Sequence, residues 1–75
     1  MDEAKIREHL DRADRNVKRG QELIERQEER VEALARDGHP TKLHEENLNA
    51  LREVEETLKE TREAVQKELD AATDE

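Results

Sequence analysis

Three histidines and 22 carboxylic acids are the side chains of this chain that could bind a metal ion or transfer a proton. His39 and His44 stand five residues apart, and the proline between them keeps His39 out of any helix that carries His44. Metal-binding histidines on one helical face, alone or with a glutamate, need a spacing of three or four residues. Glu8 and His9 are adjacent and diverge on a helix. The sequence therefore predicts no metal site and no cofactor.

Nucleophilic catalysis and nucleic-acid binding also lack the residues that they need. Serine and cysteine are both missing, so neither a serine–histidine pair nor a thiolate is available. Proteins that bind nucleic acids usually carry a clear basic footprint. Here the net charge is −8, there is no aromatic residue, and acids interrupt the one basic stretch, which consists of Arg12, Arg15, Lys18 and Arg19. We expect no enzyme activity and no nucleic-acid binding.

The apolar residues of the first half follow a regular spacing, with alternating steps of four and three residues. This heptad spacing is typical of helices that pack side by side in coiled coils. It predicts a helix over residues 3–36, which would be about 50 Å long. The expected packing seam of this helix consists of Ile6, Leu10, Ala13, Val17, Gly20, Ile24, Gln27, Val31 and Leu34.

A turn interrupts the helical pattern in the middle of the chain. Gly38 suits the left-handed position after a helix end, and Pro40 cannot continue a helix. The second helix, expected over residues 41–71, begins with either Pro40 as its first residue or Thr41 as its N-cap. We expect residues 72–75 to fray. The turn residues are Asp37, Gly38, His39, Pro40 and Thr41.

The second helix carries a similar but less regular seam. It begins at His44 with Asn47 or Leu48, ends at Ala72, and has as its main members Leu51, Val54, Leu58, Thr61, Val65 and Leu69. A short turn makes two long helices antiparallel neighbours. Folding about His39 would place Gly20 against Leu58. The predicted fold is all-α, an antiparallel two-helix hairpin that forms a single domain over residues 1–75.

The apolar surface is wider than a two-helix seam requires. Leu23, Leu43 and Leu48 lie beside the expected contacts and are candidates for an oligomer or partner face. A hairpin of this size has a small core and gains stability by association. We therefore expect a homo-oligomer, most simply a homodimer that forms a four-helix bundle, and a function in protein binding through helix packing.

Several positions allow two interpretations. Gly20 is either a hinge or a site of close packing. The polar seam residues Gln27 and Asn47, with Thr61 as a milder case, either set the register or lie at a wet edge. Acid-to-base pairs four residues apart, including Glu55–Lys59 and Glu63–Lys67, are expected on solvated faces.

The second half of the chain is the acidic one. Residues 38–75 hold 11 acids and five bases, which keeps a small acidic regulator of a basic protein surface as the alternative function. No apolar stretch is long enough to suggest a leader peptide or a membrane span. A cytoplasmic location is therefore expected.

The stretch from Arg15 to Leu51 resembles a group of short, uncharacterised proteins of proteobacteria. The residues that carry this resemblance are Val17, Gly20, Ile24-Glu25-Arg26-Gln27, Val31, Leu34, Arg36-Asp37-Gly38-His39 and Thr41. The resemblance implies a bacterial helical hairpin with an R-D-G-H-x-T turn. It implies no activity.

Overall fold

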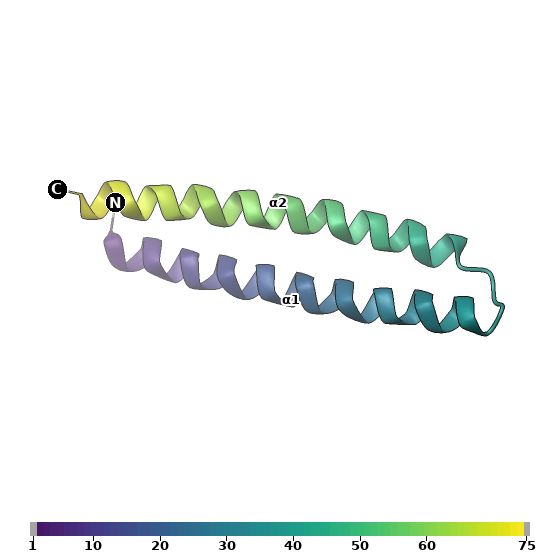
Figure 1. Ribbon diagram of the computed structural model, residues 1–75. Coiled ribbons are helices and arrows are strands. Elements are labelled where there is room, and N and C mark those ends of the chain that lie inside the picture. The colour runs from purple at the N-terminus through teal and green to yellow at the C-terminus, as the bar shows by residue number, and fades with distance from the viewer. Residues whose placement is uncertain (1, 75) are drawn as a thin grey trace.

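A computed structural model describes residues 2–74 as two long helices, α1 over Glu3–Arg36 and α2 over Lys42–Thr73. The helices lie side by side and antiparallel, so the start of α1 and the end of α2 lie together at the end opposite the turn (Figure 1). The molecule measures 59 × 14 × 13 Å. The predicted all-α antiparallel hairpin is therefore confirmed.

The start of α1 is held by local hydrogen bonds. Asp2 has an extended backbone, and its carboxylate accepts a hydrogen bond from the Ala4 amide at 3.1 Å, as an N-cap does. Glu3 lies in the first turn, where negative charge is favourable, and pairs with Arg7 at 2.9 Å. Asp2 thereby satisfies the amides of Ala4, Lys5 and Ile6, the last two through its carbonyl group, without help from α2.

The turn after α1 depends on Gly38, whose φ is +76°. This left-handed conformation brings the Gly38 amide to the Ala35 carbonyl at 3.1 Å and the His39 amide to the Leu34 carbonyl at 2.9 Å. The two bonds form a Schellman motif, which satisfies the last carbonyl groups of a helix. Gly38 has the role that its position after the helix predicts.

The second helix differs from its expected bounds of 41–71 at both ends. It begins at Lys42, with Thr41 as the N-cap residue, and the Thr41 carbonyl accepts the Glu45 amide at 2.9 Å. It continues to Thr73, because Ala72 is still partly covered at the helix interface. Residues 72 and 73 are therefore helical rather than frayed. Met1 and Glu75, which the expected domain and tail include, lie outside the described residues.

Burial along α1 follows a single heptad-spaced stripe. Every residue of α1 outside this stripe is exposed, and every residue within it is buried or half-buried. The stripe consists of the nine residues of the expected seam: Ile6, Leu10, Ala13, Val17, Gly20, Ile24, Gln27, Val31 and Leu34.

Burial along α2 differs from the expected seam at two positions. Val54 is 56% exposed and Thr61 is exposed, whereas their neighbours Glu55 and Arg62 are covered. Placing Val54 and Thr61 in the seam was therefore wrong. The covered residues of α2 keep the alternating steps of four and three residues, even where the residue at that step is charged. The covered stripe of α2 is His44, Leu48, Leu51, Glu55, Leu58, Arg62, Val65, Leu69 and Ala72, and Gln66 beside Val65 is also half-buried.

The core between the two helices is thin. Its fully covered apolar residues are Ile6, Ala13, Leu48 and Leu69, and no described large side chain has less than 2% of its surface exposed. Leu48, expected on a partner face, therefore belongs to this core. Most other seam residues are only half-buried, so much of the apolar surface of each helix remains accessible.

Candidate helix-docking face

Charged side chains cross one face of the hairpin. Arg62 Nε lies 2.7 Å from Asp14 Oδ1, and Arg52 pairs with Glu28 at 3.6 Å. All four side chains are about half exposed, so each pair contributes at most about 1 kcal/mol. We call this the ion-pair face. Its charged side chains are paired with each other and partly exposed to solvent.

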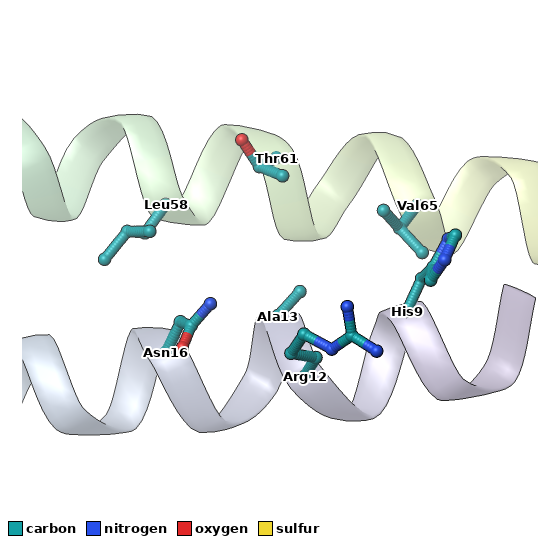
Figure 2. Close-up of a pocket in the computed structure, with 7 residues that line it drawn as sticks. All are labelled: His9, Arg12, Ala13, Asn16, Leu58, Thr61 and Val65. Atoms are coloured by element: carbon teal, nitrogen blue, oxygen red, sulfur yellow. The ribbon is translucent and has the colours of Figure 1, made fainter.

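The opposite face contains an apolar groove between the helices. On α1, Asn16 and Leu23 flank Gly20, whereas Asp14 flanks Val17 on the other side of the seam, so the groove and the ion pairs lie on opposite faces. Figure 2 shows Ala13 of α1 pointing toward α2, between Thr61 and Val65. We call this the groove face. Its lining residues are His9, Arg12, Ala13, Asn16, Arg19, Gly20 and Leu23 of α1, and Leu51, Val54, Leu58, Thr61 and Val65 of α2.

Large apolar side chains are exposed along the groove face. Leu23 is 42% exposed and Val54 is 56% exposed, and both line the groove. Leu43, near the turn, is 69% exposed and borders a shallower hollow with Pro40 and His44. Apolar groups gathered on one face mark a surface suited to docking, unlike single apolar residues scattered over a surface.

A second heptad-spaced stripe runs along the groove side of α2. Its members are exposed, none is charged, and several are small. A helix with two apolar or neutral stripes is suited to packing against two neighbours, as each helix of a four-helix bundle does. We call it the neutral stripe: Leu43, Asn47, Ala50, Val54, Thr57, Thr61 and Ala64.

Bases line the α1 side of the groove, and acids lie beyond the neutral stripe on the outer side of α2. Four bases repeat every seven residues along α1, and two of them, Arg12 and Arg19, line the groove. Three acids repeat every seven residues along α2, and each follows a member of the neutral stripe by three residues: Leu43, Ala50 and Thr57. All are exposed. The basic stripe is Lys5, Arg12, Arg19 and Arg26, and the acidic stripe is Glu46, Glu53 and Glu60.

Glu55 and Gly20 form a polar contact inside the seam. Glu55 is 4% exposed, and neither carboxylate oxygen has a hydrogen-bond partner among residues 2–74. The carboxylate lies against Gly20, where an added β-carbon would be 2.5 Å from Glu55 Oε2. Helix α1 is unbroken here, so Gly20 is a close-packing site and not a break in the helix.

Two expectations about this contact were wrong. The residue against Gly20 is Glu55 rather than Leu58. Glu55 also does not lie on a solvated face as the acid partner of Lys59, because its side chain is buried. The signal that sequence reasoning missed is the unbroken spacing from His44 onward, which reaches Glu55 and not Val54. Placing the apolar Val54 in the seam instead of the charged Glu55 shifted the expected seam by one residue.

Gln27 connects the two helices near the turn. Its amide nitrogen lies 3.3 Å from His44 Nδ1 and donates to the His44 carbonyl at 3.4 Å. Both side chains are half-buried, whereas Asn47, the other polar seam candidate, is exposed. Gln27 therefore links particular positions of α1 and α2, and Asn47 belongs to the surface.

Other candidate chemistry is not assembled. Across residues 2–74, no cluster of three or more histidine or acidic side chains is arranged to hold a metal ion. His39 is exposed in the turn, apart from the half-buried His44. Neither α1 nor α2 contains a segment that is long and apolar enough to cross a membrane. Comparisons with known protein families, curated proteins and solved structures find no match for this chain.

Proposed function

We propose that this hairpin is a non-enzymatic helix-packing module that self-associates into a dimeric four-helix bundle and presents that bundle to other proteins. The observation that carries the proposal is the uncharged and exposed neutral stripe of α2 beside the groove. Charged residues make up 48% of the chain and would solvate an exposed surface better than this stripe does. Solvation therefore does not account for the stripe.

The energetics of a small hairpin support association. Chains of this size rarely obtain enough stability from their own core and often acquire it by oligomerising. Covering Leu23, Leu43 and Val54 in a dimer would contribute about 1 to 2 kcal/mol for each side chain. Leu23 and Val54, two of the exposed large apolar side chains within residues 2–74, line the groove, which makes the groove face the docking face of this proposal.

The mass of the protein in solution tests this proposal. Sedimentation equilibrium at micromolar concentrations should give about twice the 8.8 kDa of one chain. A mass of one chain at all concentrations would overturn it. Leu23→Glu should weaken the dimer, whereas Gln21→Glu adds the same charge to an exposed position outside the groove lining and should not. Circular dichroism shows whether each variant remains helical.

A second candidate is an acidic regulator that binds a basic protein surface. The observation that favours it is the exposed acidic stripe, Glu46, Glu53 and Glu60. Binding through these charges would weaken strongly with salt, whereas helix packing would be much less sensitive. Capture of a basic protein that is lost at high salt and on replacing the three acids by Gln would favour this candidate over the first.

A further inference from the structure

We infer that a second copy of this chain docks with its α2 against α1 of the first copy, so that both turns lie at the same end of the bundle. This inference rests on the proposed self-association. It adds the orientation of the partner, which decides which residues meet across the dimer.

Two symmetric arrangements bring two groove faces together. With the two-fold axis parallel to the helices, α1 packs against the partner's α2, and the turns lie at the same end. With the axis across the helices, α1 packs against the partner's α1 and α2 against the partner's α2, and the turns lie at opposite ends. All neighbouring helices are antiparallel in both arrangements, so backbone direction does not distinguish them.

The charges at the edges of the groove distinguish the two arrangements. The α1 edge carries the basic stripe, Lys5, Arg12, Arg19 and Arg26, and the α2 edge carries the acidic stripe, Glu46, Glu53 and Glu60. The same-end arrangement places a basic edge beside an acidic edge twice. The opposite-end arrangement places basic beside basic and acidic beside acidic. Juxtaposed like charges disfavour an interface, and opposite charges fix its orientation.

The internal register shows which charges would meet. Gly20 lies against Glu55, so Arg19 is level with Glu56 along the hairpin, between Glu53 and Glu60. An axis parallel to the helices preserves this height. Arg19 of one copy would then lie between Glu53 of the partner subunit and Glu60 of the partner subunit, within the reach of a long side chain across a helix pair.

The apolar groups also match in the same-end arrangement. Leu23, three residues beyond Gly20, is level with Arg52 and therefore lies between the heights of Ala50 and Val54. In the dimer, Leu23 would meet the neutral stripe of the partner at these small and medium-sized side chains. The opposite-end arrangement would instead bring Leu23 against the α1 helix of the partner, where Arg12 and Arg19 line the groove.

Energy transfer between fluorescent labels tests the orientation, because the chain has no cysteine and a single introduced one is unique. His39→Cys labels the exposed turn, and Thr73→Cys labels the other end of a molecule 59 Å long. Turn-to-turn pairs should transfer efficiently, and turn-to-Thr73 pairs should not. The reverse result, or equal transfer in both, overturns the inference. A one-chain mass with no transfer overturns the proposed self-association instead.

A charge exchange provides an independent test. Arg19→Glu should raise the dimer dissociation constant by about three- to fivefold, since each substitution acts twice in a symmetric dimer. Arg15→Glu adds the same charge to an exposed position of α1 outside the groove lining and should have little effect. Adding Glu53→Arg and Glu60→Arg to Arg19→Glu should restore affinity. Equal effects of the two single variants, or no restoration, would contradict the same-end arrangement.

Discussion

The Glu55 carboxylate sits between two helices where an apolar side chain would ordinarily pack. Burying an ionisable group without a hydrogen-bond partner lowers stability, and both of its oxygens lack one within residues 2–74. The space that it occupies exists because Gly20 has no side chain, and a glycine inside a helix costs about 1 kcal/mol relative to alanine. The buried Glu55 carboxylate and the helical Gly20 therefore each lower the stability of the hairpin.

Replacing Glu55 by Met should stabilise the hairpin. Met has similar length and helix propensity, fills the same space and needs no hydrogen bond. We expect the free energy of unfolding in urea to rise by about 1 to 3 kcal/mol. The neighbouring Glu56 is exposed, so Glu56→Met should change it by less than about 0.5 kcal/mol. A loss of stability for Glu55→Met would mean that the carboxylate finds a partner in solution.

The Gln27 side chain joins α1 to His44 of α2. Gln27→Ala removes two contacts, to the His44 ring and to its carbonyl, and should lower the free energy of unfolding by about 1 to 2 kcal/mol. Gln21→Ala is the matched control, because Gln21 is an exposed glutamine of the same helix. Chemical denaturation should show no loss for the control, since alanine is the better helix former. Equal losses in both would place Gln27 at a wet edge instead.

At the scale of elements, the turn determines how the two helices enter their contact. Gly38 ends α1 in the left-handed region, and the hydrogen bonds of Gly38 and His39 then close the helix before α2 starts at Lys42. An L-residue with a side chain is strained in this conformation. The hairpin therefore depends on one glycine for a compact connection.

Gly38→Ala should lower the free energy of unfolding by about 1 to 2 kcal/mol, because the left-handed conformation becomes costly. No neighbouring atom lies within 4 Å of the added β-carbon position, so the effect would come from the backbone and not from a clash. His39→Ala, at an exposed turn position, should change stability by less than about 0.5 kcal/mol. Thermal melts of the two variants would measure the difference, and equal melting temperatures would contradict the strain argument.

At the scale of the whole molecule, buried apolar packing at the end of the hairpin opposite the turn holds the two helices together. Ile6 is 2% exposed and Leu69 is 7% exposed, near the end where the chain termini meet. Neither helix would be stable alone in water, since most of the stability of a protein helix comes from packing its apolar face. Ordered packing at this end is therefore needed to hold the two helices together along their length.

Ile6→Ala should lower the free energy of unfolding by about 2 to 4 kcal/mol, because it leaves a cavity in a core that has few fully covered residues. Denaturation monitored by helicity would measure this loss. Leu10→Ala removes a half-buried side chain one turn away and should cost less. A larger loss for Leu10→Ala than for Ile6→Ala would show that the end of the hairpin opens in solution.

The sequence by itself determined the class of fold and the turn, because these depend on local chemistry. Alternating steps of four and three residues predict helices, and Gly38 followed by Pro40 predicts where the first one stops. The nine residues of α1 that the structure covers could also be read directly, since α1 has one unambiguous stripe. The N-cap Asp2 and the left-handed Gly38 likewise depend only on residues that are close in the sequence.

Only the tertiary structure decided which stripe of α2 meets α1. Two stripes run along α2, the covered stripe with Glu55 and Arg62 and the neutral stripe with Val54 and Thr61, and at these positions only the neutral stripe is uncharged. Hydrophobicity alone favours Val54 over Glu55 and Thr61 over Arg62 at these two places in the hairpin contact. The register between the helices selects the covered stripe, because the space at Gly20 accommodates Glu55 and Asp14 pairs with Arg62. Val54 and Thr61 are thereby left exposed, and the neutral stripe to which they belong is the one that our proposed dimer would cover.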